Sequence, residues 1–234
     1  MLNTTNSKWK TIFKGTVIIL LILVSLGLIF NEQIEDQLVS TYRPIITAKT
    51  IQQNKRKHAN YDFDNVKALD LQSVAKSRLN AERIPVIGSI LVPKVKVHLP
   101  IAKGTSNTTL ALTAGTLRAD QKMGKGNYPL AGHNMMKKDV LFSPLYFKSK
   151  VGDKVYLTDM KQIYTYKITI RKFIKATDTS VIKQTQKPMI TLITCDSTGN
   201  NRLMLRGILI GHESFNQANN KLQKQFSNKF NSQL

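Results

Sequence analysis

Cysteine and acidic side chains are the scarce residues of this sequence. Among 234 residues there is one cysteine, Cys195, which excludes an internal disulfide and a lipid-modified cysteine near the N-terminus. Aspartate and glutamate number 14 against 35 lysines and arginines, so the formal net charge is +21 at pH 7. The lysines are spread along the chain without a nucleic-acid-binding motif, so the charge alone does not indicate a nucleic-acid partner. No internal repeat is visible, and the length allows one domain with a core.

The cysteine ends a run of residues that is typical of a buried β-strand. This run, Met189 to Cys195, is rich in β-branched side chains, and apolar alternation resumes at Arg202. The two runs predict a hairpin in which Cys195 and Arg202 lie opposite each other, with their β-carbons roughly 5 Å apart. Arg206 lies further along the same face, about 13 Å from Arg202, and is expected to be a surface charge.

A cysteine at the tip of a strand can be understood in two ways. A free cysteine is often a small, buried and unreactive side chain. A reactive thiol instead needs a base, and His133 is the candidate because it ends the apolar run that starts at Tyr128. Gly132 before it removes a side chain where another backbone or a substrate could approach. The other histidines are expected in exposed places: His58 in a polar linker, His98 on the solvent face of a strand, and His212 where a polar tail begins.

Residues 15–31 are uncharged and mostly Ile, Leu and Val. As a helix, about 17 such residues would extend some 25 Å, just enough to cross a membrane core. Lys8, Lys10 and Lys14 precede this segment and acidic residues follow it, so the N-terminus is expected in the cytoplasm and the rest of the chain outside. A cleaved signal peptide is the alternative, because residues 25–27 form a small-x-small triplet, but this triplet lies inside the apolar run.

Beyond this segment the pattern indicates an all-β domain between two polar stretches. Residues 32–83 lack long strand patterns and allow one loosely amphipathic helix, so an extracellular stalk is expected there. Period-two segments follow and predict strands with short helical connections, one of them at 141–148; the segments are 85–92, 94–101, 151–157 and 162–173. The expected organisation is a cytoplasmic N-terminus (1–14), a transmembrane anchor (15–31), a stalk (32–83), a β domain (84–212) and a frayed or weakly helical polar tail (213–234).

Three elements of the sequence together are similar to one known family. Residues 191–195 read Thr-Leu-Ile-Thr-Cys, an Ala131-Gly132-His133 element lies upstream, and Arg202 opens the next strand. This combination resembles the class A sortases of Gram-positive bacteria, and the resemblance covers roughly residues 84–212. The membrane anchor ahead of this region is also typical of that family.

The resemblance implies an eight-stranded sortase-type β-barrel and a cysteine transpeptidase that needs no cofactor. In this interpretation Cys195 is the nucleophile, His133 the general acid/base and Arg202 the stabiliser of the substrate and the tetrahedral intermediate, while Thr194 and Ala131 contact the substrate. The enzyme would cleave a Leu-Pro-x-Thr-Gly signal of a surface protein between Thr and Gly, then join the threonine to an amine of a peptidoglycan precursor. An imidazolium and a guanidinium beside the thiol would favour the thiolate.

Two departures from family patterns narrow the interpretation. Some class A members hold calcium with acidic residues in the loop before the histidine. Here residues 113–127 contain three basic residues, Arg118, Lys122 and Lys125, and one acidic residue, Asp120. Calcium needs several oxygen ligands, so no metal is expected. The stretch before Met189 is too short for the helix that class B members insert, so a general surface-protein anchoring enzyme fits best. Outside the cell, the positive charge would favour anionic lipid head groups and wall polymers.

Rival interpretations stay open on the sequence alone. A cysteine peptidase with hydrolytic output would use the same residues, because water would resolve the thioester in place of an amine. An L,D-transpeptidase is also an extracellular cysteine and histidine β enzyme, but its nucleophile follows a Ser-x-Gly type signature that residues 193–195 lack. A non-enzymatic, membrane-tethered wall-binding protein is the third possibility.

Overall fold

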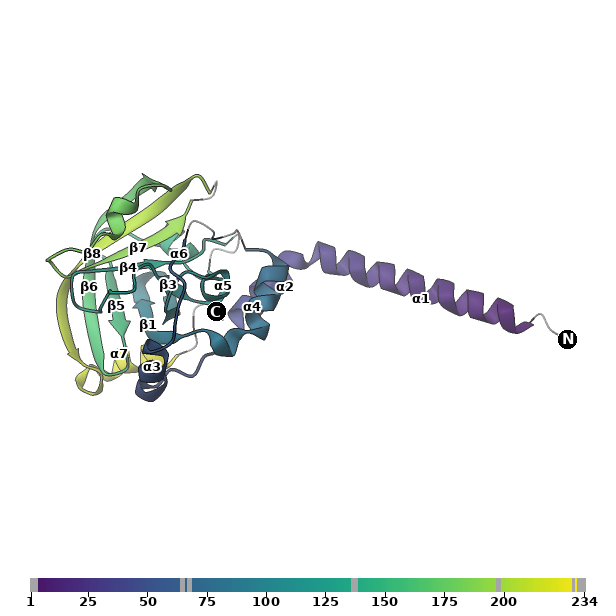
Figure 1. The fold of residues 1–234 in the computed structure, drawn as a ribbon, viewed down its shortest axis with the longest axis horizontal. Helices are drawn as coiled ribbons and strands as arrows, with labels where there is room; N and C mark the ends of the chain where they lie inside the picture. Colours follow the sequence, from purple (N-terminus) through teal and green to yellow (C-terminus); the bar gives the residue numbers. More distant parts are fainter. Residues whose placement is uncertain are drawn as a thin grey trace.

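A closed barrel of eight strands forms the body of the molecule in the described part of the chain, and a long helix projects from it (Figure 1). The computed structural model describes residues 4–63, 66, 69–135, 139–196, 199–228 and 230. The strands are hydrogen-bonded in the order β1-β2-β3-β4-β7-β8-β6-β5, and β5 pairs with β1 to close the barrel. Their bounds are β1 Val86–Val92, β2 Val97–Ala102, β3 Ala114–Thr116, β4 Asn127–Ala131, β5 Lys154–Thr158, β6 Gln162–Lys175, β7 Met189–Cys195 and β8 Asn201–Ser214. The predicted eight-stranded barrel is confirmed.

The direction of the strands decides which loops share an edge of the barrel. β2 pairs with β3, and β4 with β7, in parallel, whereas the other pairs are antiparallel. Parallel strands end at the same edge of a sheet. The residues that follow β4 therefore emerge beside the end of β7, although more than 50 residues separate them in the sequence.

Alternating side chains build the core of the barrel. Ile190 and Leu192 of β7 are 0% and 1% exposed, and Leu203 and Leu205 of β8 are each 1% exposed. All four belong to one continuous hydrophobic cluster. Complete burial of such a side chain contributes about 1.5–3 kcal/mol to folding. This packing holds the β7–β8 hairpin, and with it Cys195, in a fixed position.

The predicted strands agree with the observed ones except at β2, at β3 and at the start of β5, which was expected at residue 151 and begins at Lys154. The segment expected to be a strand from residue 94 begins pairing only at Val97, because Pro93–Val95 form a short 3-10 turn and Lys96 has a left-handed backbone with a φ of 58°. β3 has three residues, too few for alternation to be recognised. The short helical connection expected at 141–148 is α6, Ser143–Lys148.

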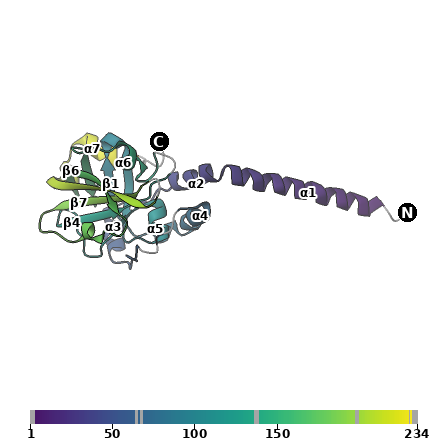
Figure 2. The same cartoon turned by 90° about the horizontal axis from the view of Figure 1, so that it is seen from above.

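The projecting helix is α1, which spans Thr4–Ile29 (Figure 2). Its segment Ile12–Ile29 has a mean hydropathy of 2.6, and none of that segment is buried inside the protein. By length and composition this helix is able to cross a membrane. It begins earlier and ends slightly earlier than the predicted span of residues 15–31.

The segment expected to be a stalk packs against the barrel. It forms the helices α2 (Asn31–Ser40), α3 (Ala48–Lys55) and α4 (Leu71–Leu79), and both views place α4 beside α5, Asn107–Leu112 (Figures 1 and 2). Val39, Ile51 and Val74 are each at most 2% exposed, and Val39 and Val74 belong to the main core. Each short helix contributes only one buried apolar side chain. The sequence therefore carried only a weak periodic signal, and the one loosely amphipathic helix that it allowed corresponds to α4.

The C-terminal tail also packs against the barrel, which corrects the expected environment of His98. Phe226 of α7, Asn220–Ser227, is 8% exposed and packs with Leu91 and Ile163. His98 was expected on the solvent face of its strand but is 5% exposed, because its ring lies 5.9 Å from that of Phe226 and 4.6 Å from that of Phe230. The remaining short elements are 3-10 turns: η1 Ala81–Arg83, η2 Pro93–Val95, η3 Thr179–Ile182 and η4 Phe215–Gln217.

Candidate active site

Cys195 is the last residue of β7 and lies on the outer face of the barrel wall. Thr194, Leu192 and Ile190 alternate toward the interior, so the side chain of Cys195 points the other way and is half-buried. Cys195 pairs with Arg202 of β8, as the hairpin prediction required. The thiol and the guanidinium are thus neighbours across two antiparallel strands.

His133 reaches the same edge of the barrel from β4. Ala131 pairs with Ile193 in the parallel β4–β7 ladder, and the amide of Gly132 donates to the carbonyl of Ile193 at 3.1 Å. β4 ends at Ala131, and continuing the same register by two residues puts His133 level with Cys195. Gly132 is required at this point, because a β-carbon there would lie 2.6 Å from the ring of Phe142.

Burial keeps the resting thiol and imidazole uncharged. Burial lowers the pKa of His133 to about 4, and the positive charge of Arg202 adds to this shift. Burial also raises the pKa of the Cys195 thiol, which Arg202 opposes and Asp196 reinforces. His133 as a whole residue is half-buried, and its Nε2 atom is buried and has no hydrogen-bond partner within the described residues. The sequence alone left the protonation of this resting pair open.

The guanidinium of Arg202 is held by the loop that joins β7 to β8. Its Nη1 donates to the carbonyls of Gly199 at 2.7 Å and Asn201 at 3.1 Å. Asp196 closes the same loop, where its carboxylate accepts from the backbone and side-chain nitrogens of Asn201. These bonds fix one edge of the guanidinium beside Cys195, and its charge acts on both Cys195 and His133.

Thr194 and Ala131, the two predicted substrate contacts, differ in accessibility. Ala131 is half-buried at the end of β4. Thr194 is 3% exposed, and its hydroxyl is buried without a hydrogen-bond partner in the part of the chain that is described. The hydroxyl lies on the interior side of the strand that carries the nucleophile. Ala131 therefore has accessible surface, whereas the side chain of Thr194 has almost none.

Asn134 joins the two halves of the site and was not predicted. Its Nδ2 donates to the carbonyl of Cys195 at 3.1 Å, and its backbone forms an isolated bridge with Leu141. The bond ties the loop that carries His133 to the end of β7. The position directly after His133 was the available signal in the sequence, but alternation does not reveal which carbonyl a polar side chain will reach.

Arg206 is not the surface charge that was expected. It pairs with Thr191, and its Nη2 donates to the carbonyl of Val181 at 3.1 Å, which fastens the turn η3 to the barrel wall. Its Nε is buried without a partner among the residues described. The turn between β6 and β7 folds back over β8 and covers this arginine, and strand alternation alone could not indicate that contact.

The remaining histidines and acidic residues lie away from this group. His58 and His212 are exposed, and the ring of His212 stacks on Tyr164 at 6.2 Å. In the loop before β4, Asp120 accepts two hydrogen bonds from Arg118, at 2.9 and 2.7 Å. The described residues contain no group of three or more His, Cys, Asp or Glu side chains that could hold a metal ion.

Comparison with known proteins places this chain among characterised relatives. It matches the Sortase domain family over residues 90–212. It is 40% identical over 222 residues to Sortase A of Listeria monocytogenes, covering 93% of this chain and 97% of that one, and 37% identical over 227 residues to Sortase A of Streptococcus agalactiae, covering 92% of each. The solved structure of the Listeria monocytogenes sortase A aligns with a TM-score of 0.58 and 46% identity, over 62% of this chain and 99% of that one.

The family match covers the barrel from β1 to β8, and the relatives align over nearly the whole chain. The chain therefore belongs to the sortases, as a class A member, and is a cell-wall sorting transpeptidase.

Proposed function

We propose that this enzyme cleaves a Leu-Pro-x-Thr-Gly signal of a surface protein between Thr and Gly, and transfers the threonine to an amino group of a cell-wall precursor. Cys195 is the nucleophile, His133 the general acid/base and Arg202 the electrostatic stabiliser. The observation that carries this proposal is the register at one edge of the barrel. The Cys195–Arg202 pair and the β4–β7 ladder bring a thiol, a neutral imidazole and a guanidinium together.

The neutral resting pair sets the order of proton transfers. The imidazole of His133 takes the proton of the Cys195 thiol as sulfur attacks the threonine carbonyl carbon. Negative charge then develops on the carbonyl oxygen, and Arg202 stabilises it. His133 returns the proton to the departing glycine amine, which leaves a thioester. The acceptor amine attacks this thioester, His133 takes its proton, and sulfur leaves as the thiolate and is protonated again.

A peptide assay tests this function directly. The full chain in neutral detergent is incubated with a Leu-Pro-x-Thr-Gly peptide and an oligoglycine or alanyl amine, and the products are identified by mass spectrometry. The expected product carries the amine joined to threonine. Cleaved peptide without any joined amine, at saturating acceptor, would assign a hydrolytic peptidase instead.

We also propose that α1 anchors the enzyme as a single-pass membrane protein. Its apolar segment of 18 residues has the required length, and the lysines before it and the acidic residues after it favour a cytoplasmic N-terminus. Residues 1–14 would then be cytoplasmic, and everything after residue 31, including the barrel, extracellular. Protease digestion of intact protoplasts should degrade the barrel and spare the N-terminus.

The two arginines of β8 should respond differently to replacement by lysine. Arg202→Lys keeps the charge but loses the planar guanidinium that donates to two loop carbonyls, so kcat/KM is expected to fall by about 10²-fold. Arg206→Lys loses the single bond to Val181 and should cost less than about tenfold. Steady-state assays at equal folded fraction check this, and a larger loss for Arg206→Lys would move the stabilising role to that residue.

Alkylation of Cys195 should show that its thiolate is scarce at neutral pH. Because burial raises the thiol pKa, the rate of reaction with iodoacetamide is expected to keep rising above about pH 8.5, the usual thiol pKa. Arg202→Gln should shift the profile to still higher pH, because Arg202 opposes the effect of burial on this pKa. A fast plateau between pH 5 and 8 would instead indicate a resting thiolate and imidazolium.

A further inference from the structure

A basic cavity lies at the edge of the barrel where β4 begins, opposite the edge where His133 and Cys195 meet. Its volume is about 430 Å³, within the range of small-molecule sites. It is bounded by the end of α3, the loop before β4 and the turn between β5 and β6. Five basic side chains line it against one acidic side chain, Asp159; the basic ones are Lys55, Lys103, Arg118, Lys122 and Lys125.

Three of the five cations already have partners, which leaves the charge of the other two uncompensated. Lys55 forms an ion pair with Asp159 at 3.3 Å, Arg118 binds Asp120, and Lys103 donates to the carbonyls of Lys55 and Lys57. Within the described residues, no ion pair forms at Lys122 or Lys125. The cavity therefore keeps a strong positive potential.

The backbone holds Lys122 and Lys125 next to each other. They face each other across a tight turn, in an isolated antiparallel bridge in which the amide of Lys125 donates to the carbonyl of Lys122 at 3.1 Å. Gly124 in this turn has a φ of 76°, and its amide donates to the hydroxyl of Tyr166 at 2.9 Å. Like charges placed opposite each other are unfavourable unless an anion lies between them. The turn thus places two exposed cations at neighbouring positions on the wall of the cavity.

Tyrosine side chains form the other part of the wall. Tyr61 and Tyr164 are half-buried and Tyr128 is buried, and all three line the cavity. Tyrosine rings offer apolar faces and hydroxyl groups, which suit the carbon skeleton of a polyol or sugar. We propose that this cavity binds a phosphate ester of a polyol or sugar, with the phosphate at Lys122 and Lys125 and the organic part against the tyrosines. Such a group occurs in anionic wall polymers and in lipid head groups.

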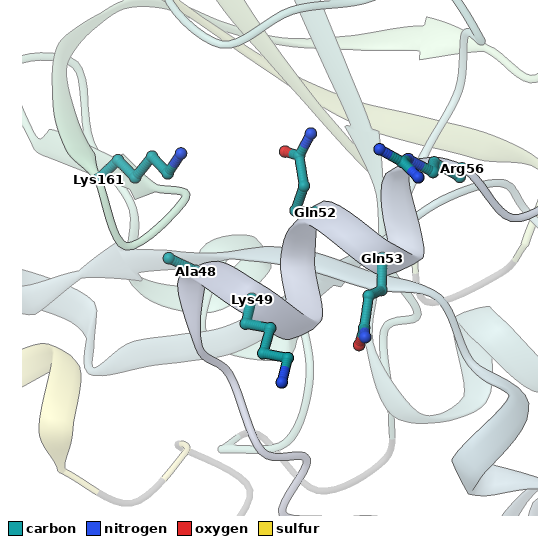
Figure 3. A pocket seen from close by; sticks show the side chains of 6 residues that line it. All are labelled: Ala48, Lys49, Gln52, Gln53, Arg56 and Lys161. Carbon is teal, nitrogen blue, oxygen red and sulfur yellow. The ribbon is translucent and has the colours of Figure 1, made fainter.

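A second cavity on the other side of α3 provides a matched control. It is lined by Ala48, Lys49, Gln52, Gln53, Arg56 and Lys161, and Figure 3 shows Lys49 pointing to the other side of α3 from Lys161. Lys49 and Lys161 therefore do not face each other. Lys49 and Lys161 are exposed, as are Lys122 and Lys125, so replacing either pair removes the same charge without disturbing the core.

The test measures binding and does not depend on catalysis, so its failure is separate from a failure of the proposed function. The full chain in neutral detergent is titrated calorimetrically with glycerol phosphate and with inorganic phosphate, and in a further arm with micelles containing phosphatidylglycerol. Saturable binding of glycerol phosphate is expected, tighter than that of inorganic phosphate. If the protein binds the phosphatidylglycerol micelles more strongly than glycerol phosphate, the lipid head group is the source of the ester. If it binds them more weakly, the source is a soluble polymer.

The double variant Lys122→Gln/Lys125→Gln is expected to weaken glycerol phosphate binding by at least about tenfold. The control Lys49→Gln/Lys161→Gln should change it by less than about twofold, although both variants lose two positive charges. Equal weakening of glycerol phosphate binding in the two variants would mean that the ligand is attracted by the net charge of the protein. That result would contradict a specific site at Lys122 and Lys125. Absence of saturable binding, or equal affinity for both phosphate compounds, would also overturn the assignment.

Discussion

Replacement of Cys195 by alanine is expected to abolish product formation, to below about one per cent of the wild-type rate. The reaction requires sulfur as the attacking atom. Cys195 is the only cysteine of the sequence, so no second thiol can replace it. The fold should persist, since no disulfide is lost and the side chain is half-buried at the end of β7, with the β7–β8 backbone pairing unchanged. The loss in unfolding free energy should stay below about 1 kcal/mol.

The measurement combines the peptide assay with thermal unfolding of the same preparations. A Cys195→Ala protein that unfolds near the wild-type temperature and makes no thioester intermediate, as judged by intact-mass analysis, supports the nucleophile assignment. Clear residual turnover in a preparation free of wild-type enzyme would remove Cys195 from that role. Cys195→Ser is a useful second variant, because a hydroxyl of similar size should be inactive as well.

Replacement of His133 by alanine is expected to lower kcat/KM by at least about a hundredfold, the range typical of a general acid/base. The wild-type enzyme should lose activity as the pH falls toward about 4, because below the lowered pKa of His133 the imidazole is protonated and cannot accept the thiol proton. The variant should lack this acid limb. Its residual rate should rise with pH as the Cys195 thiol ionises without help.

Two other histidines serve as controls for that variant. His58 and His212 are exposed and outside the site, so His58→Ala and His212→Ala should keep at least about half of the wild-type rate. His98→Ala is unsuitable, because its ring packs in the core against two phenylalanines and the substitution would affect folding. A greater loss in either control than in His133→Ala would mean that the base has been assigned to the wrong residue.

The hairpin that carries Cys195 was predictable because its information is local. β-branched alternation in residues 189–195 and 202–210 defined two strands, and taking Cys195 and Arg202 as their last and first paired residues predicted the observed pairing. The position of His133 was predictable only as the end of an apolar run. Its alignment with Cys195 depends on a parallel pairing of β4 with β7, and parallel pairing cannot be deduced from either strand alone.

The errors concern contacts between segments that are distant in the sequence. His98 alternates with apolar neighbours as an exposed residue would, but Phe226 and Phe230 of the tail cover it. Arg206 was expected to be exposed, but its guanidinium donates to the carbonyl of Val181 in the preceding turn. The protonation of His133 and Cys195, which the sequence left open, also has a non-local cause, because desolvation by the surrounding structure is the largest cause of both pKa shifts. No pattern within one strand contains that information.

The packing of α2 limits the distance between the barrel and the helix α1. A single residue, Phe30, separates α1 from α2, and Val39 at the end of α2 is already part of the barrel core. With α1 in a membrane, the enzyme has no flexible tether, and its active site samples a thin shell above the lipid surface. The local concentration of a substrate at the active site is then high only if that substrate is also held at this distance from the lipid surface. Surface proteins still retained at the membrane and lipid-linked precursors meet this condition, whereas a soluble peptide gains nothing from the anchor.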